Sequence, residues 1–76
     1  MGGKHSVKIR GRQTAIFLED EFWEELKSIA RAKNVSIGHL VQQIQDNKRR
    51  IPNLSSAVRT YVLLQVRERV APLAKR

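Results

Sequence analysis

Hydrophobic and polar side chains alternate with a period of two near the N-terminus. Between residues 12 and 18, one face would carry Arg12, Thr14, Ile16 and Leu18, and the other Gln13, Ala15 and Phe17. Successive side chains of a β-strand point to opposite faces, so this alternation is typical of a strand with one buried face. Threonine, isoleucine and phenylalanine also favour strands. The pattern therefore predicts a strand over residues 12–18.

The apolar spacing then changes to that of amphipathic helices. A first helix is expected from Asp20 to Lys33, because its apolar residues recur at helical spacing and its first turn is acidic, as the helix dipole favours. Asn34 suits the left-handed conformation that ends many helices. A second helix is expected from Ser36, a good N-cap residue, to about Asn47. The apolar stripes of these helices are Phe22, Trp23, Leu26, Ile29 and Ala30, and Ile37, Leu40, Val41 and Ile44.

A third helix is expected after Pro52, because a proline disfavours helical conformation at the residue before it. Asn53 or Ser55 is the expected N-cap, and Pro72 is expected to end the helix. Its inner face would be formed by Leu54, Ala57, Val58, Tyr61, Val62 and Leu64 or Gln65. The predicted fold class is therefore mostly α, with one short N-terminal strand followed by three helices.

A single strand leaves a row of backbone donors and acceptors without partners, so its pairing strand would have to come from a second chain. A two-fold axis through such a pair gives an antiparallel ribbon and an intertwined homodimer. The chain has 76 residues and no cysteine, which leaves association as the means of enlarging a thin core. The monomer is therefore not expected to fold alone.

Charge is distributed along the chain in blocks. Fifteen Lys and Arg against seven Asp and Glu give a net charge of +8, which favours polyanionic partners such as nucleic acids. Residues 1–18 carry four basic residues and no acid, residues 19–25 carry five acids and no base, and the remainder is basic again. The exclusion of acids from the N-terminal segment indicates a functional basic arm rather than a solvated tail.

Several classes of function are not expected. The acids crowd one helix start and no nucleophile is paired with a base, so the chain is not predicted to be an enzyme. His5 and His39 lack companions at ligand spacing, so neither a metal nor another cofactor is expected. No apolar run approaches the ~20 residues that cross a bilayer. The first six residues fit a myristoylation pattern, but the pattern is short and common, so attachment to a membrane surface is only the third alternative.

Three consecutive segments carry a family pattern: Arg12-Gln13-Thr14-Ala15-Ile16-Phe17-Leu18, the acid-started helix from Asp20 to Lys33, and the turn Asn34-Val35-Ser36 with the apolar helix after it. In them the chain resembles the ribbon-helix-helix family of bacterial DNA-binding proteins, the family of Arc and MetJ. The later segment Asn53-Leu54-Ser55-Ser56-Ala57-Val58-Arg59 is similar to a small bacterial subgroup with an additional C-terminal segment. The resemblance implies a cytoplasmic homodimer that regulates transcription.

The resemblance also implies how the chain is divided. Residues 1–7 would be a disordered basic arm, residues 8–47 the ribbon-helix-helix core, and residues 48–76 a C-terminal extension with the third helix. The core of the dimer would be formed by Ile16, Leu18, Phe22, Leu26, Ile29, Leu40, Val41 and Ile44.

In that family, outward side chains of the ribbon read bases in the major groove, and the start of the second helix binds a DNA phosphate. The resemblance thus implies base contacts by Arg10, Arg12, Gln13, Ala15 and Phe17, and phosphate contacts by Lys8, Ser36, Ile37 and Gly38. Ala15 and Phe17 are unusual on a wet groove face. Either Arg10 and Arg12 take over the base reading, or something apolar, such as the third helix or a partner protein, covers this face.

The leading hypothesis is a dimeric DNA-binding protein whose partners are double-stranded DNA and a second copy of itself, with higher-order assembly on DNA left open. The second hypothesis is a protein-interaction module, such as an antitoxin-like dimer whose third helix binds another protein. Tyr61, Val62 and Leu64 would then stay exposed for that partner.

Overall fold

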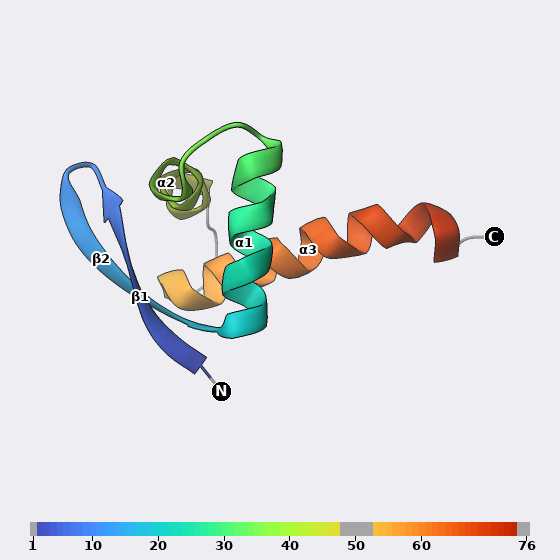
Figure 1. The fold of residues 1–76 in the computed structure, drawn as a ribbon, viewed down its shortest axis with the longest axis horizontal. Coiled ribbons are helices and arrows are strands. Elements are labelled where there is room, and N and C mark those ends of the chain that lie inside the picture. Colours follow the sequence, from blue (N-terminus) through green and yellow to red (C-terminus); the bar gives the residue numbers. More distant parts are fainter. Residues whose placement is uncertain (1, 48–52, 75–76) are drawn as a thin grey trace.

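A β-hairpin packs on three helices in the computed structural model (Figure 1), which describes residues 2–47 and 53–74. The break predicted at Pro52 lies outside the described residues. In Figure 1 the hairpin lies at one side of the molecule, and the second half of the last helix extends away from it. The elements are β1 (Gly2–Ile9), β2 (Arg12–Glu19), α1 (Asp20–Ala32), α2 (Ile37–Asn47) and α3 (Leu54–Ala74).

Strand β1 corrects the sequence analysis, which predicted a single strand and a disordered arm over residues 1–7. Residues 2–9 instead pair antiparallel with residues 12–19 of the same chain. The strand predicted over residues 12–18 is confirmed and extends to Glu19. Because the ribbon is completed within one chain, the missing pairing partner is no longer a reason for an intertwined dimer.

A two-residue turn joins the strands. Arg10 has φ 52° and Gly11 has φ 80°, and positive φ at both central residues is the requirement of the type I′ turn, whose twist matches that of the flanking strands. Glycine adopts this conformation freely, whereas a non-glycine residue such as Arg10 does so less often. The Arg10-Gly11 dipeptide therefore sets the register in which Ile9 lies opposite Arg12.

One face of the hairpin is buried against the helices. The inward side chains are those of Val7 and Ile9 in β1 and of Ile16 and Leu18 in β2, and each is at most 5% exposed. They alternate with more exposed residues, as expected of a ribbon with one buried face. Toward the N-terminus of the same face, the His5 ring stacks on Trp23 of α1, with 4.1 Å between ring centroids and 8° between ring planes. The buried core consists of Val7, Ile9, Ile16, Leu18, Leu26, Ile29, Ala30, Leu40, Val41, Ile44, Ala57, Val58 and Val62.

The residues expected to form a dimer core are covered by their own chain. Seven of the eight are buried, and Phe22 is half-buried against them. Five of these side chains are at most 1% exposed, so a second chain is not needed to remove them from water. Those five are Ile16, Leu18, Leu26, Leu40 and Val41.

The helix ends follow local sequence signals. Asn34 has φ 60°, and the N–H groups of Asn34 and Val35 donate to the carbonyls of Arg31 and Ala30, which is the Schellman arrangement that ends α1. The Ser36 hydroxyl accepts from the His39 N–H at 3.0 Å at the start of α2. At the start of α3, the cap is Asn53, whose side-chain oxygen accepts from the Ser56 N–H at 2.8 Å. Contrary to prediction, α3 does not end at Pro72 but continues to Ala74.

The start of α3 covers the outer edge of β2. The Phe17 N–H donates to the Ser55 hydroxyl at 2.9 Å, and the Arg59 guanidinium donates to the Phe17 carbonyl at 3.0 Å. Arg59 also donates to the Glu19 carboxylate at 3.1 Å. An uncovered edge strand exposes unpaired backbone groups, and these contacts satisfy part of that edge and attach α3 to the ribbon.

Stability is expected to fall at acid pH partly through Glu19. A hydrogen bond from its own backbone N–H, and then the hydrogen bond from Arg59, hold the pKa of Glu19 below its ordinary value. A carboxylate with a lowered folded-state pKa contributes stability above its unfolded pKa and loses it as pH falls through the folded pKa. In urea unfolding at a series of pH values, Glu19→Gln is expected to flatten the acid part of the stability profile. An unchanged profile would show that Glu19 is not linked to folding.

Candidate nucleic-acid interface

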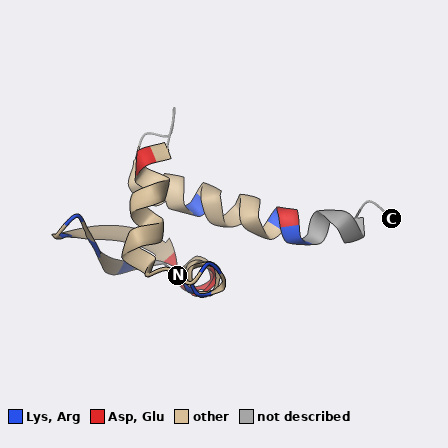
Figure 2. Ribbon diagram, turned by 90° about the horizontal axis from the view of Figure 1, so that it is seen from above, with Lys and Arg blue, Asp and Glu red and all other residues tan. Residues whose placement is uncertain are grey.

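The outward face of the hairpin, here called the ribbon face, is exposed along both strands. It carries Lys4 and Lys8, and its acid, Glu19 at the end of β2, is paired with Arg59. Figure 2 shows basic positions on the hairpin at one side of the molecule. The register arranges six of its side chains as three cross-strand pairs: Lys4 with Phe17, Ser6 with Ala15, and Lys8 with Gln13. Glu19 lies opposite Gly2. The ribbon face is therefore a basic, solvent-facing strip to which both strands contribute.

Phe17 is not covered by the third helix. Its backbone is bound by Ser55 and Arg59, but its side chain is 58% exposed. Of the alternatives given for Phe17, cover by the third helix is therefore wrong. An exposed aromatic ring beside Lys4 is available for contact with another molecule.

The two arginines at the hairpin turn lie in different surroundings. Arg10, in the turn itself, donates to both carboxylate oxygens of Asp46 in α2, at 2.8 and 2.9 Å. Both side chains are about half exposed, so water screens this ion pair. Arg12 is exposed at the start of β2. Arg10 is thus paired with an acid. Arg12 is free of such a pair in the described structure, but strand alternation places it on the face of Ile16 and Leu18 rather than on the ribbon face.

The start of α2 lies against the end of β1. A Cβ atom on Gly38 would lie 2.4 Å from the Lys8 carbonyl oxygen, so this close approach requires a glycine. The amides of the first helical turn have no acceptor within a helix, and Ser36 supplies one for His39 only. Lys8, Ser36, Ile37 and Gly38, which sequence analysis assigned to phosphate contact, are thereby brought to one side of the molecule.

Two further basic residues lie at the α2 start. An open hollow of about 570 Å³ is lined by Ser36 and Ile37 together with Lys27 and Arg31 of α1. Lys27 is paired with Glu24 at 3.1 Å, whereas Arg31 is exposed at the last turn of α1. An anion in this hollow would meet a helix N-terminus and basic side chains together.

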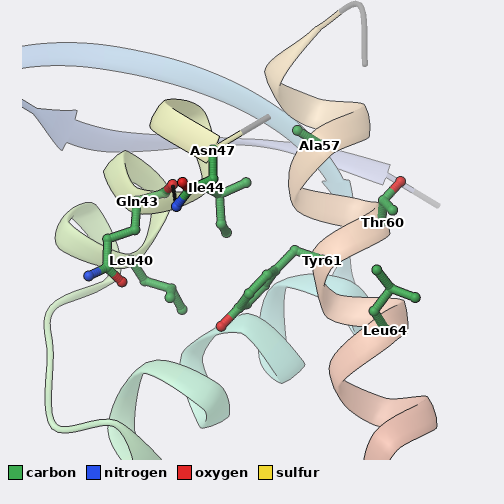
Figure 3. A pocket seen from close by; sticks show the side chains of 8 residues that line it. All are labelled: Leu40, Gln43, Ile44, Asn47, Ala57, Thr60, Tyr61 and Leu64. Carbon is green, nitrogen blue, oxygen red and sulfur yellow. Dashed lines mark hydrogen bonds between the residues drawn. The ribbon is translucent and has the colours of Figure 1, made fainter. Parts of the chain in front are cut away.

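An apolar groove of about 400 Å³ separates α2 and α3 (Figure 3). Its lining is mainly hydrocarbon. On the α2 side of the groove, the Asn47 side-chain amide donates to the Gln43 carbonyl at 2.9 Å. Leu64, 49% exposed, lies along it, and Leu63 is similarly exposed on α3. The lining residues are Leu40, Gln43, Ile44, Asn47, Ala57, Thr60, Tyr61 and Leu64.

One residue of the predicted protein-binding set is misplaced. Val62 is 2% exposed and belongs to the core, so it is not available to a partner. Tyr61 is half-buried and Leu64 is exposed, and both line the apolar groove. Helical spacing explains the error, because Val62 lies one turn after the buried Val58 and so faces inward.

Sequence analysis missed the contributions of β1 and of α1. Lys4 and Ser6 were assigned to a disordered arm, although Val7 and Ile9 alternate with polar residues just before Gly11, which is a hairpin signal. By sequence alone, Lys27 and Arg31 are charges toward the C-terminal end of the first helix, where the helix dipole favours them. Their approach to Ser36 depends on the chain reversal at Asn34.

The comparisons place this architecture in a family. The family model described as "Ribbon-helix-helix domain" matches residues 3–66, which run from β1 into α3 and so exceed the residues 8–47 expected from the resemblance. No curated protein and no solved structure gave a significant match. No helix in the described part of the chain is long and apolar enough to span a membrane. Ribbon-helix-helix domains are DNA-binding modules of regulatory proteins rather than enzymes. Because the match covers most of its length, this chain belongs to the ribbon-helix-helix domain family.

Proposed function

We propose that this protein is a homodimeric, sequence-specific DNA-binding protein that regulates transcription by inserting its hairpin into the major groove. The observation that carries the proposal is the exposed ribbon face, which lies beside the start of α2. Its Lys4 and Lys8 are exposed, and the acid at its end, Glu19, is paired with Arg59. The major groove, about 12 Å wide, admits a two-stranded ribbon. The proposed compartment is the bacterial cytoplasm, because the DNA is there.

Base reading is proposed for the second strand and the turn. A glutamine such as Gln13 can bond an adenine edge through two hydrogen bonds, and an arginine such as Arg12 can bond guanine in the same way. Ala15 and Phe17 would contact thymine methyl groups. Arg10 would reach DNA only after leaving Asp46, and an exposed pair of this kind costs little to separate.

Phosphate binding is proposed at the start of α2. The first-turn amides of Ile37 and Gly38 and the Ser36 hydroxyl would hold one phosphate, and Lys8 on the ribbon face would hold another. Arg31 and Lys27 extend the predicted set, because they line the same hollow as Ser36. Such contacts fix the position of the ribbon in the groove without reading its sequence.

DNA binding is therefore expected to depend steeply on salt, and Arg31→Ala is expected to reduce that dependence. Each phosphate contact contributes about 0.9 to the slope of log affinity against log salt concentration, so the variant should lose about one from the slope. Fluorescence anisotropy of a labelled duplex at several salt concentrations measures this. Arg67→Ala, which removes an equal charge from the part of α3 that extends away from the hairpin, is the matched control and should keep the slope.

A wild-type affinity that barely changes between low and high salt would contradict the phosphate contacts. A slope lowered equally by both variants would show that only the net charge matters and that the hollow beside Ser36 is not a phosphate site.

Dimerisation is proposed through the apolar groove between α2 and α3. With the ribbon completed within one chain and the core covered, the groove beside the exposed Leu64 of α3 is an apolar surface that gains from association. A second copy would cover Leu64 and the groove beside it. Sedimentation equilibrium of the wild-type chain tests this, and a monomer at all micromolar concentrations would exclude the homodimer.

A protein-interaction module is the second candidate function, favoured by the same exposed residues. Leu64 is about half exposed and lies with Tyr61 in the groove, whereas Leu63, similarly exposed, lies beside α1. An antitoxin-like partner would bind this surface in place of a second copy. Stable co-purification with an unrelated chain, combined with no shift of any duplex, would favour this candidate over the first.

A further inference from the structure

The ribbon face has a composition that a ribbon made from two copies of one strand would not have. On β1 it presents Lys4, Ser6 and Lys8, which offer two cations and a hydroxyl group. On β2 it presents an amide, a methyl group and an aromatic ring, followed at the end of the strand by the Glu19 carboxylate, which is paired with Arg59. A two-fold axis through a shared ribbon would repeat the same side chains on both halves. Here the halves differ, because both strands belong to one chain.

The three cross-strand pairs are close pairs. The N–H and carbonyl of Phe17 point away from β1, toward Ser55 and Arg59, so Phe17 and Lys4 do not exchange backbone hydrogen bonds. Antiparallel pairs alternate between bonded and non-bonded types, so the pairs Ser6–Ala15 and Lys8–Gln13 are also non-bonded. Non-bonded partners have Cα atoms about 4.5 Å apart and adjacent side chains. Each pair therefore presents one compact unit to a ligand.

We infer that one chain carries a complete groove-reading ribbon, so that each ribbon recognises an asymmetric DNA element of about five base pairs. This inference rests on the proposed DNA-binding function and names the form of the site. Pairs on one face are two residues apart, or about 6.8 Å, which matches roughly two base-pair rises of about 3.4 Å. Three pairs thus cover roughly five base pairs.

The side chains of the three pairs indicate a further residue, on β1, that would contact a base edge. Ser6 and Ala15 are the smallest pair and lie in the middle, so they allow the backbone to approach the bases. Ser6 can bond a base edge, whereas Ala15 offers only a methyl contact. Ser6 is therefore a specificity-determining residue on β1, and Gln13 is its counterpart on β2.

The pairing is tested with cysteines, because the chain has none of its own. In a variant carrying Ser6→Cys and Ala15→Cys, the pair lies within the Cα separation that disulfides require. After oxidation, a non-reducing denaturing gel is expected to show a cross-linked single chain. Variants carrying only one of the two substitutions measure background cross-linking between chains. A covalent dimer formed by the double variant well above that background would overturn the inference, because it would place β1 and β2 of each ribbon in different chains.

The proposed base contacts of Ser6 and Gln13 are tested by selecting DNA duplexes from a random library. The wild-type chain is expected to select a non-palindromic element for each ribbon. Ser6→Ala, which changes no charge, should reduce discrimination roughly fivefold at one base pair, as the loss of one hydrogen bond implies. Gln13→Ala should reduce it about tenfold at a different base pair. Unchanged discrimination in Ser6→Ala, with Gln13→Ala affected, would overturn the role of β1.

The two failures are distinguishable. Selection of no sequence by the wild-type chain would overturn the proposed function and the base reading with it. Selection of palindromic elements centred on a single ribbon would overturn only the inference, since the protein would still bind DNA.

Discussion

Replacing both Lys4 and Lys8 with alanine is expected to weaken DNA binding about 30-fold at 0.15 M salt. Both lysines are exposed on the ribbon face, and the acid at the end of that face, Glu19, is paired with Arg59. If each neutralises one phosphate, the variant loses about 1.8 from the slope of log affinity against log salt, and that loss corresponds to about 30-fold at this concentration. Fluorescence anisotropy with the selected duplex measures both the affinity and the slope.

The control removes two charges from elsewhere. Lys33 shares a hollow with Gln65 and Arg69, and Arg67 lies in the part of α3 that extends away from the hairpin. The double variant Lys33→Ala with Arg67→Ala has the same net charge as the ribbon variant. If both double variants lose the same affinity, binding depends on overall charge, and the ribbon face is not the contact surface.

Replacing Gly38 with alanine is expected to lower the free energy of unfolding by about 1–3 kcal/mol, as overpacking of a close contact does. The new Cβ atom would lie 2.4 Å from the Lys8 carbonyl oxygen, a backbone atom that cannot rotate away. Helix propensity alone would give the opposite sign, because alanine is favoured over glycine within a helix by up to about 1 kcal/mol. The clash is expected to dominate, and urea unfolding gives the difference.

Gly3→Ala is the control for this substitution. Its Cβ would meet no atom nearer than 3.7 Å, so no comparable loss is expected. Gly11 would not serve, because its φ of 80° makes any side chain strained there. An alanine variant at position 38 as stable as the wild type would mean that α2 does not lie against β1 as described. If the close approach of Gly38 to Lys8 also positions the phosphate site at the start of α2, Gly38→Ala should bind DNA more weakly even when it is fully folded.

The helices were predictable because their signals are local. The stripe of α1, the acids in its first turn and the left-handed Asn34 all lie within one short segment. Ser36 identified the start of α2 for the same reason. In the third helix, Asn53 and Ser55 were both good capping residues, and sequence could not choose between them. The structure makes Asn53 the cap because Ser55 is bound to the backbone of Phe17.

Strand β1 could not be recognised by its own composition. Only Val7 and Ile9 are apolar on its inner face, and His5 is half-buried there by stacking on Trp23, which is far away in the sequence. The turn signal was weak, because Arg10 is an uncommon residue at positive φ. Strand pairing is a non-local property, so an unpaired β2 was assigned to a second chain rather than to the preceding segment.

The candidate site was predictable only in part. The β2 positions of the ribbon face followed from the period of two, and the α2 start followed from Ser36 and the family resemblance. Ser6 and Arg31 became candidates only when the hairpin and the reversal at Asn34 brought them beside those positions. A residue whose role depends on a neighbour from another element carries no signal of its own in the sequence.

The stack between His5 and Trp23 gives the molecule an intrinsic optical reporter. Trp23 is the single tryptophan of the chain, and its partly buried ring stacks on His5 of β1 at the edge of the core. Its emission therefore depends on whether the first strand is docked. Opening of the hairpin, alone or on DNA, can be followed in the unlabelled wild-type protein, separately from melting of the helices, which circular dichroism detects.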